Sequence, residues 1–339
     1  MYTKSFVLKV LLLIIFFVFV TYNLYHTFVE QQYQKKFENF MNKYNKSYTN
    51  ETERNMRFKR FQKSLSIIEQ LNKDHSDFTY YGITKFSDLS PEEFVSRHLS
   101  IKGKKKKELR DTKFKRSITA VTLETIDWRN EGVVNSVRNQ KTCGACWAIS
   151  VVEIIESVYA IKTGSLKTLS VQEALDCSDG INQGCLGGSP AILLQWLVKN
   201  NITLQTEERY PTIYENQICK INKSINESDG IRVVSFISLN LFNREDLLLS
   251  YIMKSPVAVA VNAIPWQYYV GGIVRHCENN LSSLNHAVEI VGYVLGENPY
   301  YIIKNSWGTD HGIDGYIYVG IGDNECGIGW EVDVVLNVV

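Results

Sequence analysis

The sequence predicts an α+β fold, in which a helical part precedes a strand-rich part. In residues 146–161 apolar side chains recur at helical spacing, and Gly164 lies just past the expected end of the helix. A second helix is expected over residues 171–175. From residue 233 onward, β-branched and aromatic residues dominate VVSFISLN, PVAVAVNA, HAVEIVGYV, YYIIKN and GYIYVGI, which are separated by Gly, Asn and Pro.

The N-terminus combines Lys4 and Lys9 with eleven apolar residues, VLLLIIFFVFV, at positions 10–20. A run of this length is typical of the apolar region of a signal peptide and is short for a membrane-spanning helix. We therefore expect residues 1–21 to be a cleaved signal peptide. No A-x-A pattern follows in FVTYNLYH, so an uncleaved membrane anchor is the alternative. Sequons for N-glycosylation agree with a secretory route and stand at Asn45, Asn50, Asn201, Asn222, Asn226 and Asn280.

Residues 31–88 predict two amphipathic helices, because large apolar side chains recur there at spacings of three and four. They are Phe37, Phe40, Met41 and Tyr44 in the first helix, and Phe58, Phe61, Leu65 and Ile68 in the second. Residues 101–116, IKGKKKKELRDTKFKR, contain nine basic and two acidic side chains. Such a run is typical of a solvated linker that is open to proteolysis, and we expect a domain boundary just after it, near Val121.

Charge divides the chain at the same place. Residues 1–121 carry 23 Lys and Arg against 12 Asp and Glu, and residues 122–339 carry 14 against 24, which gives net charges of +11 and −10. The basic part has no platform of aromatic residues among its lysines, so it does not indicate nucleic-acid binding. We expect the two parts of the chain to attract each other.

Seven cysteines all lie after residue 140. In an oxidising compartment they allow up to three disulfides and leave one thiol. Cys143 and Cys146 form a C-x-x-C pair that permits a metal site, a redox dithiol, or a nucleophile beside a structural cysteine. No second pair of thiolates or histidines has zinc-ligand spacing, and a redox dithiol belongs to cytosolic proteins of another type. The pattern therefore favours one cysteine as a nucleophile.

Cys146 would begin a helix, where backbone N–H groups and the positive end of the helix dipole favour a thiolate. His286 begins an apolar strand segment, and Asn305 ends the next one. A histidine in this position is more often a core residue. Together, however, the three residues provide a nucleophile, a general base and a group that orients the base.

At these residues the chain resembles papain-family cysteine proteases of the cathepsin type. The resemblance rests on Q-x-x-C-G-x-C-W-A at residues 140–148, G-C-x-G-G at 184–188, NHAV at 285–288 and NSWG at 305–308. VRNQ, ESVYAIK, LSVQEALDCS, QYYVGGIVRHC and CGIG are most similar to the cathepsin O subfamily. The likeness implies a papain-like fold of two lobes, one helical and one like a β-barrel, over residues 122–339.

The resemblance also extends to the N-terminal part, which it identifies as an inhibitory propeptide over residues 22–121. The family's E-R-F-N-I-N helix is matched by Glu53, Arg57, Phe61, Ile68 and Asn72, with Ser64 where the pattern has asparagine. A second propeptide motif is matched by Gly82, Thr84, Phe86 and Asp88. An acidic compartment would protonate carboxylates and weaken the attraction between the propeptide and the enzyme. We expect acid-triggered release with cutting near residues 113–121.

The family's catalytic roles fall on four residues of this chain. Cys146 and His286 would form a thiolate–imidazolium pair, Asn305 would orient His286, and the Gln140 side chain with the Cys146 N–H would stabilise the oxyanion. The disulfides that the family implies are Cys143–Cys185, Cys177–Cys219 and Cys277–Cys326. Neither a metal nor another cofactor is implied.

Substrate-binding positions follow from the same likeness. They are Gly187 and Gly188, where a substrate backbone would lie, and Ser189, Pro190, Ala260, Asn285, Ala287 and Trp307. Glu331 would lie at the base of a pocket that accepts basic or apolar side chains, although a solvent-facing Glu331 is an equal alternative. Two departures from the family are Lys141-Thr142 after the glutamine and His311 in place of a second tryptophan.

The sequence therefore predicts the zymogen of a cysteine endopeptidase that is lysosomal or secreted, and that degrades proteins as a monomer. Its expected partners are peptide and protein substrates, its own propeptide and cystatin-type inhibitors. The alternative is a catalytically silent binding protein on the same fold.

Overall fold

A computed structural model describes residues 4–74, 78–101, 125–220 and 229–339. Several predicted features lie outside these residues. They are the basic linker beyond Ile101, the boundary near Val121, and the sequons at Asn222 and Asn226.

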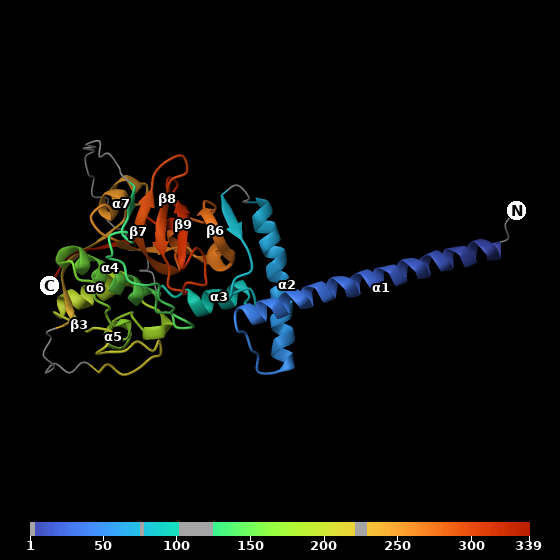
Figure 1. The fold of residues 1–339 in the computed structure, drawn as a ribbon, viewed down its shortest axis with the longest axis horizontal. Helices are drawn as coiled ribbons and strands as arrows, with labels where there is room; N and C mark the ends of the chain where they lie inside the picture. The colour runs from blue at the N-terminus through green and yellow to red at the C-terminus, as the bar shows by residue number, and fades with distance from the viewer. Residues whose placement is uncertain (1–3, 75–77, 102–124, 221–228) are drawn as a thin grey trace.

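The predicted α+β architecture is confirmed (Figure 1). The helices are α1 (Lys4–Lys43), α2 (Glu51–Asp74), α3 (Pro91–His98), α4 (Cys146–Thr163), α5 (Val171–Cys177), α6 (Pro190–Lys199) and α7 (Glu245–Ile252). The strands are β1 (Thr79–Tyr81), β2 (Ile126–Asp127), β3 (Thr203–Leu204), β4 (Ile231–Leu239), β5 (Val257–Val261), β6 (Tyr269–Val274), β7 (His286–Val294), β8 (Tyr300–Lys304), β9 (Tyr316–Gly320) and β10 (Val332–Val338). Short 3₁₀ turns are η1 (Gly184–Leu186), η2 (Ile264–Tyr268), η3 (Leu281–Ser283) and η4 (Glu325–Gly327).

The strands form a sheet in the order β1-β6-β9-β8-β7-β5-β10-β4-β3, and β2 pairs with β7. Neighbours are antiparallel, except that β6 and β9 are parallel. Because β7 and β8 are antiparallel, the start of β7 lies beside the end of β8. The register Glu289↔Lys304 therefore brings His286 and Asn305 to the same edge.

Two lobes have separate hydrophobic cores. The helical lobe packs around α4, in which Trp147, Ile149, Ile154 and Ile155 are almost completely buried. The other core lies between the sheet, α7 and η2, and includes Trp266, Tyr293 and Trp307. α4 is apolar on nearly every face because the helices of its own lobe cover one side and β7 and β10 cover the other. Burial of each large side chain contributes about 1.5–3 kcal/mol.

Charged residues are buried where the lobes meet, and we call this group the interlobe charge cluster. Its members are Arg138, Glu153, Glu156, Glu289 and Lys304. The Lys304 ammonium lies 2.8 Å from Glu153 and 3.5 Å from Glu289. Arg138 pairs with Glu153 at 3.2 Å and with Glu156 at 2.6 Å. The cluster connects α4 to β7 and β8, the strands that carry His286 and Asn305.

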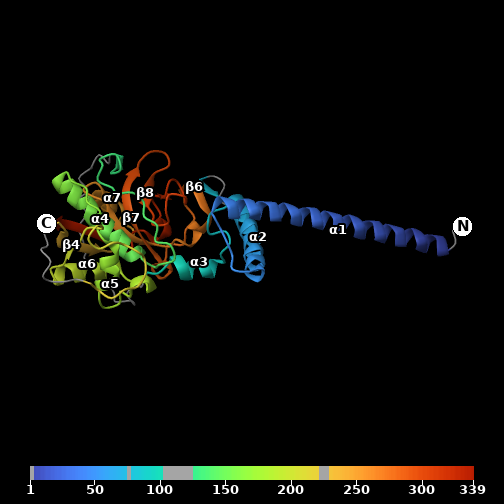
Figure 2. The ribbon, with the colours of Figure 1, turned by 60° about the horizontal axis from the view of Figure 1, so that its bottom comes forward.

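The N-terminal helix α1 extends away from the rest of the molecule, and only its C-terminal part meets α2 (Figures 1 and 2). There Phe37 and Phe40 pack with Phe58 and Phe61, which confirms the two predicted helices. Residues 11–43 are long and apolar enough to cross a membrane, although a signal sequence has the same properties. The signal peptide over residues 1–21 stays a prediction.

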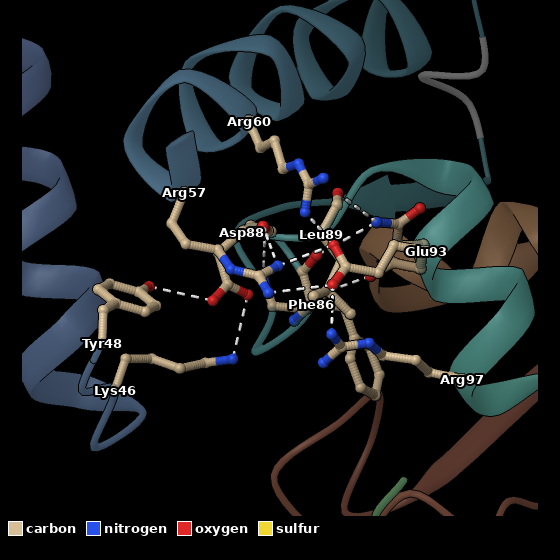
Figure 3. A network of polar contacts seen from close by, with 12 residues as sticks. Lys46, Tyr48, Arg57, Arg60, Phe86, Asp88, Leu89, Glu93 and Arg97 are labelled. Atoms are coloured by element: carbon tan, nitrogen blue, oxygen red, sulfur yellow. Dashed lines mark hydrogen bonds and ion pairs between the residues drawn. The ribbon is translucent and has the colours of Figure 1, made fainter. Parts of the chain in front are cut away.

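A polar network connects α2 and the segment between α1 and α2 to α3 and the segment that precedes it (Figure 3). Lys46 and Tyr48 each donate to the Asp88 carboxylate at 3.0 Å, and the Arg57 guanidinium binds both Glu93 oxygens at 2.8 and 3.0 Å. Arg60 and Arg97 also pair with Glu93. Arg57 also donates to the Asp88 carbonyl at 3.2 Å, which joins residues of the two predicted motifs, and the Glu93 carboxylate accepts from three guanidinium groups.

The N-terminal part docks on the edge of the sheet. β1 adds to β6 in antiparallel register, with Thr79 opposite Gly272. Further on, Thr84 donates to the Gln267 carbonyl at 2.6 Å, and the hydroxyls of Ser64 and Tyr268 lie 3.0 Å apart. Ser64, which departs from the motif's asparagine, thus makes a contact of its own with η2.

Candidate active site

Cys146 is the first residue of α4, is fully buried, and is the free cysteine. Its neighbour Cys143 is bonded to Cys185. The other disulfides are Cys177–Cys219 and Cys277–Cys326, so the structure has the three pairings that the sequence resemblance implied. Burial raises the pKa of the Cys146 thiol, and nearby backbone of Ala287, Ser100 and Trp147 opposes that shift only in part.

His286 and Asn305 meet as the strand register requires. The His286 Nε2 lies 2.9 Å from the Asn305 Oδ1, which also accepts from the Ser306 N–H at 2.8 Å. Since this oxygen is an acceptor, Nε2 carries the proton, and Nδ1 is left as the acceptor nitrogen. Nδ1 has no hydrogen-bond partner among the described residues. Burial lowers the pKa of His286 to about 4.

Trp307 covers this pair. Its ring stacks on His286 with centroids 4.8 Å apart, and it is 1% exposed. His311, at the position where the family usually has a second tryptophan, packs its ring edge-on to Trp307 at 4.9 Å. Phe86 and Phe94 of the N-terminal part pack edge-on against Trp307, with ring centroids 5.4 and 5.3 Å from that of Trp307. His311 thus takes part in the aromatic packing around Trp307.

Gln140 is buried between the lobes. Its Oε1 accepts from the Ser306 hydroxyl at 2.6 Å, so its Nε2 is directed toward carbonyl oxygens. Nε2 donates to the carbonyls of Cys143 at 2.9 Å and of His98 at 3.2 Å. A side-chain amide held in this way is suited to donate to an oxyanion.

Residues 98–101 cross the site above Cys146. The Gly188 N–H donates to the Ser100 carbonyl at 3.3 Å, and the Ile101 N–H donates to the Asn285 carbonyl at 3.2 Å. Ile101 and Gly188 form a parallel bridge. A Cβ on Gly187 would lie 2.0 Å from the Ser100 oxygen, so only glycine admits this backbone. No pattern in the sequence predicts this crossing, which depends on where α3 docks.

The predicted pocket residues come from both lobes. Ala260 pairs with Ala287 across β5 and β7, and the Ala260 N–H donates to the Glu331 carbonyl at 3.0 Å. Ser189 and Pro190 begin α6 in the helical lobe. Asn285 contributes its backbone, because its side-chain oxygen accepts from the Ala263 N–H at 2.9 Å. Glu331 is half-buried and has an interaction of its own, so the predicted role of its carboxylate stays a prediction.

Known families match both parts of the chain. Residues 122–336 match the papain family cysteine protease model, and residues 37–94 match the cathepsin propeptide inhibitor domain. The chain belongs to the papain family of cysteine proteases. It is a cathepsin-like proenzyme with cysteine-type endopeptidase activity, and its propeptide is part of the same chain.

Individual relatives agree with this assignment. The protease is 38% identical to human cathepsin O over 79% of its own length and 83% of the relative's. It is 35% identical to cysteine proteinase 2 of Zea mays, over 78% and 74% of the two chains. The solved procathepsin L2 of Tenebrio molitor has a TM-score of 0.76 and 30% identity, and covers 89% of this chain and 99% of its own. The recombinant stem bromelain precursor has the same TM-score and identity, and the match covers 89% of this chain and 98% of the bromelain precursor chain.

Among the described residues no three His, Cys, Asp or Glu side chains gather as a metal site would require. The four sequons that the structure describes, at Asn45, Asn50, Asn201 and Asn280, are exposed.

Proposed function

We propose that the protease hydrolyses peptide bonds through an acyl-enzyme formed on Cys146, with His286 as general base and acid. The observation that carries this proposal is the bond from His286 Nε2 to Asn305. It leaves Nδ1 as an acceptor on a ring that Trp307 holds in place. Cys146 lies at the start of α4, where the N-terminus of the helix favours a thiolate once water reaches the site.

The reaction would proceed in two halves. The Cys146 sulfur forms a bond to the substrate carbonyl carbon, and the π electrons move to the oxygen, which accepts from Gln140 and the Cys146 N–H. The intermediate collapses as the C–N bond breaks, and His286 gives the leaving amine the proton that it has taken from the Cys146 thiol. Water, deprotonated by His286, then attacks the thioester and releases the acid and the thiolate.

We assign residues 22–121 to an inhibitory propeptide and residues 122–339 to the peptidase. The inhibitory action of the propeptide would come from residues 98–101. Ser100 and Ile101 hold the backbone groups of Gly188 and Asn285, so a substrate cannot bind there at the same time. The pair between Lys85 and Asp310, at 2.6 Å, contributes one contact between the oppositely charged parts. Acid should weaken the attraction between the two parts and speed maturation of the zymogen. Equal rates of maturation at neutral and acidic pH would contradict this expectation.

The proposed setting is the secretory pathway, with delivery to the lysosome or outside the cell and a monomeric enzyme open to cystatin-type inhibitors. The apolar helix near the N-terminus and the exposed sequons support this. A catalytically silent binding protein is not favoured, since Gln140, Cys146, His286 and Asn305 are all present.

Titration with an epoxide that alkylates active-site thiols tests the proposal. Acid-matured protein is treated with the epoxide, mapped by mass spectrometry and assayed for peptide hydrolysis. Labelling at Cys146 in proportion to lost activity is expected, and a Cys146→Ala variant provides the unlabelled control. Folded, matured protein with neither labelling nor hydrolysis would overturn the proposal.

A further inference from the structure

Aromatic rings form a continuous cluster between the propeptide and the catalytic histidine, which we call the interface ring cluster. Its members are Phe86, Phe94 and His98 from the propeptide and His286, Trp307 and His311 from the enzyme. The ring centroids of His98 and Phe86 are 4.6 Å apart, and those of Phe86 and His311, on the enzyme side, are 5.2 Å apart. The propeptide thus docks on the tryptophan that covers His286 largely through rings.

Half of this cluster consists of histidines, and all three are buried. His98 is 7% exposed, His311 is 1% exposed and His286 is completely buried. Neither ring nitrogen of His311, nor Nδ1 of His98, makes a hydrogen bond of normal geometry to any described residue. A protonated imidazole has two N–H donors, so protonation here would bury a charge that only the nearby backbone of Lys141 and of Trp266 partly stabilises.

The charged surroundings act against protonation as well. The Lys85 ammonium of the propeptide faces both His98 and His311, and each of these histidines also faces the other imidazoles. Arg97 adds a further positive charge near His98. The nearby carboxylate is that of Asp310, which is half-exposed and paired with Lys85.

Burial lowers the pKa of His98 to about 4 and that of His311 to about 3. Lys85 acts in the same direction on both, while the backbone near each ring opposes the shift. A histidine in water has a pKa of about 6.5. His98 would reach water when the propeptide leaves, and His311 would lose the cover of Phe86.

We infer that His98 and His311 together form the proton-sensitive element of propeptide release: protonation of the two imidazoles in an acidic compartment separates α3 from Trp307 and uncovers Cys146. This inference rests on the proposed zymogen function. It differs from long-range attraction between a basic and an acidic part, because it assigns the pH response to two named rings in one cluster.

The direction follows from proton linkage. The docked state binds fewer protons than the released state, so falling pH favours release once it passes below about 6.5. Between pH 7.5 and pH 5, a histidine that reaches water on release shifts the equilibrium toward release by about 30-fold; this applies to His98, and His311, which loses only the cover of Phe86, contributes less. His286 is also uncovered by release, so a variant that lacks the other two histidines keeps part of the response.

Hydrogen exchange of the full zymogen tests the inference without relying on catalysis. A Cys146→Ser chain, which cannot mature itself, is compared at pH 7.5 and pH 5 by mass spectrometry. The protection factors of residues 91–101 report opening, and they are corrected for the intrinsic exchange rate at each pH. His98→Phe and His311→Phe keep a ring and remove the titration, and the exposed His276→Gln is the control.

The protection factors of the parent zymogen should fall between pH 7.5 and pH 5. His98→Phe should make that fall about 30-fold smaller, and His311→Phe should reduce it by a smaller factor. The double variant should lose both contributions, and His276→Gln should match the parent. A parent with pH-independent protection, or a double variant that opens as steeply as the parent, overturns the inference. If residues 91–101 of a Phe variant are already unprotected at pH 7.5, the Gln variant at the same position takes its place. A parent zymogen whose protection does not change with pH would overturn the inference in either case.

Failure of the proposed function would look different. A matured wild-type protein that neither hydrolyses peptides nor takes the epoxide at Cys146 would overturn the protease mechanism, whatever the exchange result. A normal protease whose double-Phe zymogen opens like the parent would overturn only the histidine assignment.

Discussion

The interlobe charge cluster should make the mature protease less stable as the pH rises. Its three carboxylates, on Glu153, Glu156 and Glu289, face the two cations Arg138 and Lys304. One negative charge therefore has no counterpart within the cluster. Burial raises the pKa of Glu289 from 4.5 to about 7, and the attraction of Lys304 opposes this only in part. Glu289 thus holds the proton that balances the cluster in acid.

The sign and size of the effect follow from this shift. The folded state binds the proton more tightly than the unfolded state, so its stability is fully present below pH 4.5 and is lost as the pH rises toward 7. A shift from 4.5 to about 7 corresponds to about 3 kcal/mol in the free energy of unfolding. Glu289→Gln removes the titration and leaves two carboxylates for the two cations. Its oxygen can still accept from Ser157, which donates to Glu289 at 3.0 Å.

Urea unfolding of mature enzyme, alkylated at Cys146 to prevent autolysis, measures this at pH 4.5 and pH 7.5. The free energy of unfolding of Glu289→Gln, taken relative to that of wild type, should rise by about 3 kcal/mol from pH 4.5 to pH 7.5. This rise does not depend on how far the two proteins differ at pH 4.5. Exposed Glu297→Gln is the matched control and should show no such gain. If the free energies of unfolding of Glu289→Gln and wild type differ by the same amount at both pH values, Glu289 does not hold the proton that balances the cluster.

Three further variants test separate parts of the structure. Gln140→Ala should lower kcat by about 100- to 1,000-fold in matured enzyme with little change in KM, because it removes one donor to the oxyanion; an unchanged kcat would exclude that role. Arg57→Ala should destabilise the packing of α2 against α3 by about 1.5–3 kcal/mol, since it removes the bidentate partner of Glu93 but leaves Arg60 and Arg97 paired with it, and faster exchange of α3 amides in the zymogen would measure this. Lys73→Ala, from an exposed pair with Glu69, should leave those amides unchanged. Glu331→Gln should lower kcat/KM for substrates with Arg at the second residue before the cut and spare those with Leu there; an unchanged Arg to Leu ratio would place this carboxylate outside the pocket.

The proximity of the proposed catalytic residues could be predicted from the sequence because short segments place each of them. Cys146 heads an apolar helix, and His286 and Asn305 flank consecutive apolar strands, so local pattern and register bring them together. β6 was missed, because Gly271 and Gly272 interrupt its pattern and Gly272 has a φ of +79°.

The short helix α3 was also missed, although a local signal existed. Ser90 accepts from the Glu93 N–H at 3.2 Å as an N-cap, and Pro91 is the first helical residue. Its position over the active site had no such signal. The contact of Phe86 with Trp307 depends on docking between segments more than 200 residues apart, which periodicity does not encode.

The propeptide affects the chemistry of the site as well as access to it. A thiolate–imidazolium pair forms when the pKa of the thiol lies below that of the imidazole. Under residues 98–101 the order is reversed, because burial raises the pKa of Cys146 and lowers that of His286 to about 4. Both groups are therefore neutral in the zymogen. Water that enters when Ser100 leaves would reduce the cost of both charges, while the start of α4 continues to favour the thiolate. Release of the propeptide would thus open the cleft and create the nucleophile in one step.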